Sequence, residues 1–164
     1  MLPLAALASN DTAKIHTAKI NPLSPVTAAP RVHFLRLHPG DLLLESLERW
    51  AREHSIDAAS IVSAVGSLKR ATVRFAGQAR GVRLEGPLEV VSLSGTLSKD
   101  SHHLHASVSD SKGVTRGGHL TGENRVYTTL ELVIGVYPEA KFLREKDPDT
   151  GYLEWVVMPR KGNP

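Results

Sequence analysis

Residues 102–120, HHLHASVSDSKGVTRGGHL, predict a β-hairpin, because two segments of strand character flank the turn-forming residues DSKG. Successive side chains of a strand point to opposite faces of the sheet, so the first segment has one apolar face and one polar face. The apolar face carries Leu104, Ala106 and Val108, with His102 at its beginning. The polar face carries His103, His105 and Ser107.

The turn sets how the two strands pair. A three-residue loop with Gly113 in the left-handed conformation would pair Asp110 with Val114. Counting outward from that pair places His105 directly opposite His119, with β-carbons roughly 4.5–5.5 Å apart. The spacing therefore predicts two imidazoles side by side on neighbouring strands.

A third imidazole, that of His103, is the diagonal neighbour of the opposed pair and within reach of it. Gly117 and Gly118 leave room for a bulge, so a register shifted by one residue stays open. Three neutral imidazoles match a zinc site that keeps a fourth position free. The chain has no cysteine, so a metal here would depend on histidine and carboxylate. The alternative is a solvated sheet face that carries histidine and no metal.

Ahead of the hairpin, residues 31–37 (RVHFLRL) predict a strand that ends at the turn His38, Pro39, Gly40. A helix is expected next, capped by Asp41. Its apolar positions recur at three- and four-residue steps: Leu43, Leu44, Leu47, Trp50 and Ala51.

Further segments are rich in β-branched residues and predict strands. They are SIVSAVGSL and ATVRFA (from 60 and 71), PLEVVSLSGTL (from 87), VYTTLELVIGVY (from 126) and YLEWVVM (from 152). One helix followed by many strands indicates an α+β fold, a single domain with a central antiparallel or mixed sheet and a helix packed on one face. We expect a domain over residues 31–158, with a flexible tail over 1–30 and a short C-terminal tail over 159–164.

Composition is ordinary for a soluble globular protein, with 41% hydrophobic and 23% charged residues among 164. No apolar run approaches the roughly 18 residues that a membrane-spanning helix needs. The net charge of +3 falls short of the dense basic clusters typical of nucleic-acid-binding domains. The first residues do not resemble a complete signal peptide, so we expect a cytoplasmic location, with nuclear or mitochondrial locations left open.

Several motifs together resemble the PPC domain, a domain conserved between plants and prokaryotes. They are SAVGSL (63–68), GPLEVVSLSGTL (86–97), HLHASVSDSKGVTRGGHL (103–120), VYTTLELVI (126–134) and DPDTGYLE (147–154). The resemblance covers about residues 31–158. It implies assembly as a homotrimer and, in the prokaryotic type, a metal held by the residues matching His103, His105 and His119.

Plant proteins with this domain carry an AT-hook, an Arg-Gly-Arg-Pro core that enters the minor groove of DNA. This sequence has no such core, and its N-terminal segment offers only Lys14 and Lys19 as cations. Because reading of the minor groove by an arm needs several cations in one segment, we expect any DNA binding to be weak and non-specific.

Two functions from different classes fit these observations. The chain is either a trimeric metal-binding module with a DNA-associated or regulatory role, or a zinc-dependent enzyme with an open coordination position for a small-molecule ligand. For an enzyme, Glu131 and Glu89 are the candidate general bases, and Ser107 and Thr121 could orient the imidazoles. The aromatic residues are interpreted as core or interface packing residues: Tyr127, Tyr137, Tyr152 and Trp155.

Overall fold

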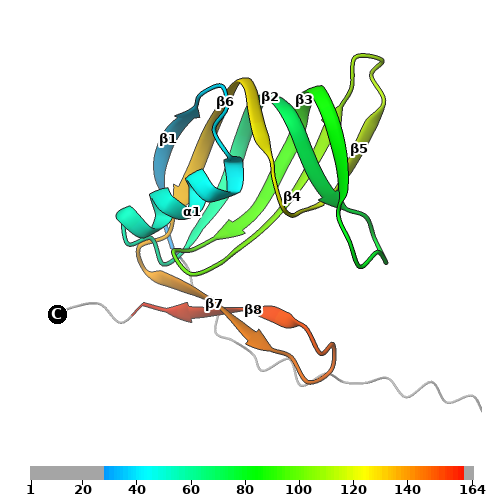
Figure 1. Ribbon diagram of the computed structural model, residues 1–164. Helices are drawn as coiled ribbons and strands as arrows, with labels where there is room; N and C mark the ends of the chain where they lie inside the picture. Colours follow the sequence, from blue (N-terminus) through cyan, green and yellow to red (C-terminus); the bar gives the residue numbers. More distant parts are fainter. Residues whose placement is uncertain (1–27, 161–164) are drawn as a thin grey trace, which may run out of the picture.

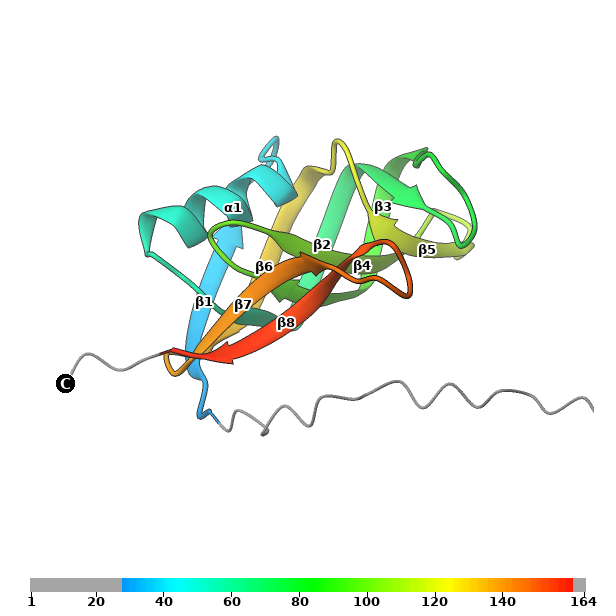
Figure 2. The same cartoon turned by 90° about the horizontal axis from the view of Figure 1, so that it is seen from below.

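The computed structural model describes residues 28–160 (Figures 1 and 2). These residues form a six-stranded antiparallel sheet, one helix and a two-stranded hairpin. The strand order in the sheet is β1-β6-β2-β3-β4-β5. The elements are β1 Arg31–Leu37, α1 Leu43–Glu53, β2 Ala59–Arg74, β3 Val82–Leu97, β4 His102–Ser109, β5 Thr115–Leu120, β6 Arg125–Val136, β7 Ala140–Lys146 and β8 Leu153–Pro159. The expected α+β fold, with a single short helix on a largely antiparallel sheet, is confirmed.

Strand β2 is the element that curls the sheet. Its 16 residues pair with β6 on one side and with β3 on the other, and its far end also pairs with β5, through Val73 with Leu120 and Arg74 with His119. Strands β2 to β5 thus close on one another. The sequence separated this strand into two segments, whereas the structure shows one strand with a register shift between Leu68 and Arg70.

The core lies between the inner face of the curled sheet and helix α1, which crosses that face in Figure 1. The helix buries the five apolar residues that the sequence predicted for its inner face. The apolar face of β4, carrying Leu104, Ala106 and Val108, is also buried. The opposite face of β4 is therefore directed away from the core.

The helix does not begin as the sequence predicted. Asp41 was expected to cap it, but the N-cap is Leu42, which has no side-chain cap. The Asp41 carboxylate instead accepts a hydrogen bond from the backbone N–H of His38 at 2.7 Å. The backbone N–H of Leu43 donates to the carbonyl of Asn124 at 2.8 Å. The first turn is thus anchored by the chain entering β6, a partner distant in sequence.

The β7–β8 hairpin packs beside the sheet. The sequence predicted β8 but not β7, whose residues AKFLREK alternate poorly. Strand β7 is placed by backbone hydrogen bonds from Tyr137 to Ala58 and from Phe142 to Asp57, both 2.9 Å. Ala58 and Phe142 belong to a second, small apolar cluster. Within residues 28–160, no helix is long and apolar enough to cross a membrane.

Candidate metal centre

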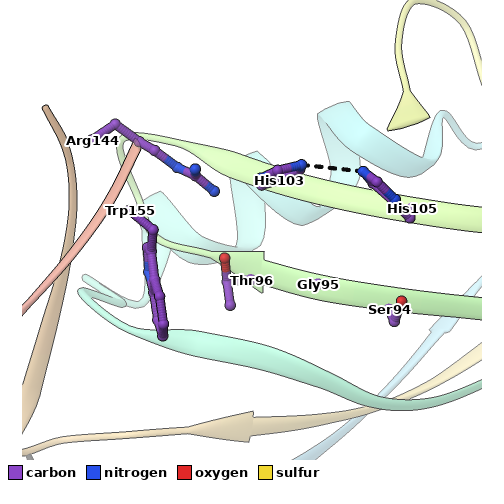
Figure 3. A pocket seen from close by; sticks show the side chains of 7 residues that line it. All are labelled: Ser94, Gly95, Thr96, His103, His105, Arg144 and Trp155. Atoms are coloured by element: carbon purple, nitrogen blue, oxygen red, sulfur yellow. Dashed lines mark hydrogen bonds between the residues drawn. The ribbon is translucent and has the colours of Figure 1, made fainter. Parts of the chain in front are cut away.

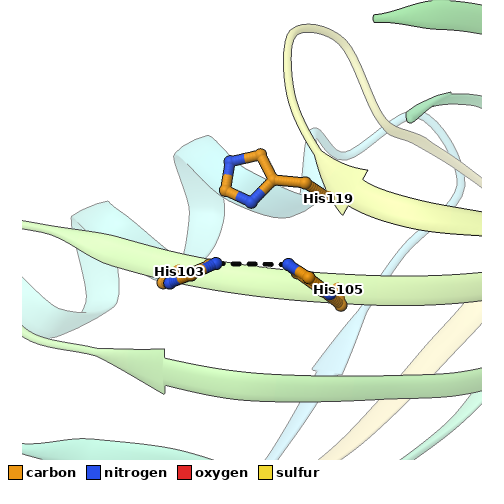
Figure 4. Close-up of side chains that lie close together, drawn as sticks. All are labelled: His103, His105 and His119. Carbon is orange, nitrogen blue, oxygen red and sulfur yellow. Dashed lines mark hydrogen bonds between the residues drawn. The ribbon is translucent and has the colours of Figure 1, made fainter. Parts of the chain in front are cut away.

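Three histidines from β4 and β5 meet on the outer face of the sheet (Figure 4). His105 pairs directly with His119, so the register expected from the turn is confirmed. The turn has the predicted form, because Gly113 has a φ of 76° and the Asp110 N–H donates to the Val114 carbonyl at 3.1 Å. A local turn therefore brings together side chains that are 14 residues apart.

The imidazole nitrogens are close enough to serve as ligands of one ion. One ring nitrogen from each of the three histidines lies within 4.8 Å of the others, and the two Nε2 atoms of His103 and His105 are 3.2 Å apart. Nitrogens bound to one tetrahedral zinc at about 2.0–2.1 Å lie roughly 3.3 Å from each other. Small side-chain rotations would bring the whole set to that spacing.

The surroundings favour neutral imidazoles, the form that binds metals. Burial, followed by the nearby His103 and Arg74, lowers the pKa of His119 to about 4. Burial, followed by Arg144, lowers the pKa of His103. The Nδ1 atom of His119 is buried and has no hydrogen-bond partner among residues 28–160. A buried ring nitrogen without a partner and the convergence of three imidazoles fit a bound divalent cation.

His102 lies outside this cluster. Its Nδ1 is 3.0 Å from the Glu48 carboxylate of helix α1, on the face of β4 that looks toward the core. The alternation of the strand therefore separates this histidine from its neighbour His103.

Two clefts open beside the three histidines. The smaller one, of about 290 Å³, is shown in Figure 3 and is lined by β3 residues 94–96, His103, His105, Arg144 and Trp155. The larger one, of about 1080 Å³, is lined in part by Arg74, Asp100, His119, Arg144 and Glu154. The β7–β8 hairpin contributes to both clefts. Sequence analysis missed Arg144 and Glu154 because no local pattern connects this hairpin with β4.

The other residues singled out from the sequence are placed less centrally. Glu131 lines a separate cavity with Phe34 and Val65, and Glu89 pairs with Ser109 at the far end of β4. Neither acid lines the clefts beside the histidines. Ser107 and Thr121 make no hydrogen bond to the three imidazoles among the described residues, and the Thr121 hydroxyl is buried without a partner there. The carboxylates that do line the larger cleft are those of Asp100 and Glu154.

The aromatic residues divide into two groups. Phe142 lies between Tyr137 and Trp155, with ring centroids 6.1 Å from the first and 4.8 Å from the second, so both of these aromatic residues pack against Phe142 of the β7–β8 hairpin. Tyr127 and Tyr152 are exposed, so neither packs in the core of the chain, and interface packing stays a prediction for both.

Comparison with known proteins identifies relatives of this chain. The sequence model of the Plants and Prokaryotes Conserved (PCC) domain matches residues 25–138. The chain is 46% identical over 134 residues to the bifunctional protein GlmU of Synechococcus sp. (strain JA-2-3B'a(2-13)), an alignment that covers 82% of this chain and 21% of that protein. The chain thus spans about a fifth of the length of the curated relatives that it matches.

Solved structures share the fold. A hypothetical protein from Salmonella enterica matches with a TM-score of 0.81 and 39% identity, over 82% of this chain and 98% of that one. A metal-containing protein from Archaeoglobus fulgidus matches with a TM-score of 0.67 and 30% identity, over 79% and 95%. A chain from Ralstonia eutropha JMP134, whose name proposes DNA binding, matches with a TM-score of 0.63 and 27% identity, over 77% and 90%.

Proposed function

We propose that this chain is a metal-binding assembly module. The premise is that it belongs to the Plants and Prokaryotes Conserved domain family. The module holds one divalent ion per chain with His103, His105 and His119. The observation that carries the proposal is the convergence of one nitrogen from each of the three rings within 4.8 Å. The similarity to a metal-containing archaeal protein supports it.

Zinc is the proposed ion. Neutral imidazole is a preferred zinc ligand, and a three-histidine site leaves a fourth position for water or a ligand atom. The chain has no cysteine, so histidine is the strongest zinc ligand that it can offer.

Assembly as a homotrimer is the second part of the proposal. The outer face of β1 and β2 supports it, because Phe34 is 78% exposed and Val65 is 64% exposed, and both line one shallow cavity. Exposed apolar side chains that gather on one face are typical of an interface.

The third part of the proposal is a DNA-associated role, in line with the name of the Ralstonia chain. The binding we propose is weak and without sequence preference, because it would rest on phosphate contacts. Duplexes rich in A/T and in G/C should bind equally and with a steep salt dependence, measured by fluorescence anisotropy. A strong A/T preference at physiological salt would contradict this role.

A zinc-dependent enzyme is the second candidate, favoured by the cleft of about 1080 Å³ beside the histidines. Glu154, which lines that cleft, is better placed as a general base than Glu131 or Glu89. Turnover of a panel of esters and phosphate esters by the zinc-loaded chain, and its loss in Glu154→Gln with zinc content kept, would favour the enzyme over the module.

The metal site is tested by elemental analysis of the purified full chain together with its native mass. We expect close to one zinc per chain and loss of most of it in His103→Ala, His105→Ala and His119→Ala. His102→Ala is the matched control, because that side chain pairs with Glu48 instead, and it should keep the metal. Zinc content that is unchanged in His105→Ala would contradict the proposed site.

A further inference from the structure

Two arginines flank the three histidines. Arg74 of β2 pairs directly with His119 of β5, so the two side chains share the outer face as direct neighbours. Arg144 of β7 lines both clefts, and its guanidinium is directed toward His103 in Figure 3. The two cations come from elements that are far apart in sequence, and both line the larger cleft.

Neither guanidinium is engaged by another group of residues 28–160. Within residues 28–160, the side chains of Arg74 and Arg144 form no ion pair and no hydrogen bond, although both residues are half-buried. Arg70, by contrast, contacts the carboxylates of Glu85 and Glu123 at 3.1 and 2.9 Å. A half-buried guanidinium offers five donors, and those of Arg74 and Arg144 are free to bind a ligand.

The charge balance around the histidines points to an anion. Arg74 and Arg144 line the cleft together with Asp100 and Glu154, so the fixed charges of these four residues cancel. One oxygen of Glu154 already accepts a hydrogen bond from the Thr150 hydroxyl at 3.0 Å. A divalent ion on the histidines would therefore leave an excess of two positive charges, which an anionic ligand would offset.

The dimensions suit a small molecule. Ligand pockets commonly measure about 300–1,000 Å³ and combine apolar walls with a few converging polar groups. The larger cleft measures about 1080 Å³ and its walls include the exposed side chains of Tyr152 and Leu153. Arginine matches carboxylate and phosphate groups because its planar fork can donate two parallel hydrogen bonds to them.

We propose that this cleft binds a small organic oxyanion, a carboxylate or a phosphate monoester, whose charged group is held by Arg74 and Arg144 beside the three histidines. The inference rests on the proposed metal site, because the ion would supply the further positive charge that favours the same group. Arg74 and Arg144 are thus ligand-binding residues, and the apolar part of the ligand lies along the β7–β8 hairpin.

Calorimetric titration of the zinc-loaded full chain with phenyl phosphate and with benzoate tests this inference. The two probes share the ring and differ in the oxyanion, so their relative affinities identify which group is preferred. Ionic strength is held constant because exposed charges are screened by salt. Arg74→Gln and Arg144→Gln should each weaken binding of the preferred probe about tenfold or more, as expected for the loss of a charge-assisted hydrogen bond.

Arg116→Gln is the matched control, since Arg116 lies on β5 three residues before His119 and pairs with Val108 on the other face. It should bind the probe as the wild type does. Equal weakening in all three variants would indicate a general charge effect and overturn the proposal.

Zinc content is measured in the same samples, so the two proposals fail separately. A chain that holds zinc but binds neither probe overturns the oxyanion site and leaves the metal site intact. If the chain takes up no zinc, the metal site fails, and the same titrations on the metal-free chain decide the inference. Binding by the metal-free chain that depends on Arg74 and Arg144 then supports the oxyanion site without a metal. Absence of binding overturns the oxyanion site.

Discussion

The pKa of His119 lies well below its ordinary value, because burial lowers it to about 4. Its ring faces His105 and His103 at centroid distances of 5.4 and 4.9 Å. A proton on this ring would be poorly solvated and close to Arg74. The residue is therefore held neutral, which prepares it for a metal and makes the metal-free fold sensitive to acid.

The metal-free chain should lose stability as pH falls from about 6.5 toward 4. The unfolded chain protonates this histidine near the ordinary value of about 6.5, whereas the folded chain does so near 4. Between these values the unfolded state binds more protons, so the free energy of unfolding decreases with decreasing pH. Urea denaturation in the presence of a chelator measures the slope, which should be smaller in His119→Gln. An identical slope in the variant would contradict the assignment.

Gly95 is a second residue on which the site depends. Its φ is +131°, and a β-carbon there would collide with the carbonyl oxygen of His103. The backbone that approaches Gly95 is that of β4 in the same chain. Gly135 is less crowded, because a β-carbon there would lie 3.3 Å from its nearest contact, the Cβ of Pro30.

Gly95→Ala should lower the free energy of unfolding by about 2–4 kcal/mol, through strain and displacement of β4. It should also reduce zinc uptake, because His103 and His105 move with that strand. Gly77→Ala is the control, since Gly77 also has a positive φ but has open space around it, and it should cost about 1 kcal/mol. Thermal denaturation measures the stability of both variants, and elemental analysis measures their zinc uptake. Equal losses in Gly95→Ala and Gly77→Ala would argue against a steric cause.

At the scale of elements, the β7–β8 hairpin completes the site. It places Arg144 and Trp155 beside β4, and Figure 2 shows it lying across that strand. Its attachment includes Asp57, whose side chain is only 10% exposed and lies 3.0 Å from Lys99 Nζ and 3.4 Å from Arg160 Nε. This acid links the loop before β2 to the end of the hairpin.

Asp57→Asn keeps the size of the side chain and removes the charge that holds both cations. We expect a loss of about 1–2 kcal/mol in stability, between the values for exposed and buried ion pairs because both cations are partly exposed. Amide exchange at Phe142 should accelerate, since its N–H donates to the Asp57 carbonyl. Glu85→Gln, which removes exposed ion pairs, should lower the stability less than Asp57→Asn does. Unchanged exchange in β7 would show that the charge does not secure the hairpin.

At the scale of the whole molecule, the sheet has two faces with different partners. The inner face packs on helix α1, whereas the outer face of β1 and β2 exposes Val32, Phe34, Val62 and Val65. The three histidines proposed as metal ligands come from one chain, from β4 and β5. Assembly and metal binding can therefore be separated by mutation.

Phe34→Glu should convert the proposed homotrimer into single chains and leave zinc uptake unchanged, because a charge on the outer face disfavours burial of that face. Native mass spectrometry gives the oligomeric state and elemental analysis gives the metal content. Val114→Glu, at an exposed apolar position in the β4–β5 turn, is the control and should leave the mass unchanged. If the Phe34→Glu variant still forms a trimer, the subunit interface does not lie on this outer face.

The hairpin and its histidine register could be predicted from sequence because both depend on local rules. A strand alternates its side chains, and a turn closed by Gly113 aligns the strands that it joins, so His105 and His119 were expected to face each other. Helix α1 was predictable for the same reason, since its apolar residues recur at the helical period.

The tertiary structure decided what depends on partners distant in the sequence. The N-cap of helix α1 is Leu42 because the carbonyl of Asn124 accepts a hydrogen bond from the N–H of Leu43. Strand β2 is one strand because it pairs with three others. The surroundings of the histidines were decided in the same way, by packing. Arg74 lies beside His119 only because β2 reaches β5, and Arg144 lies beside His103 only because the hairpin folds back over β4.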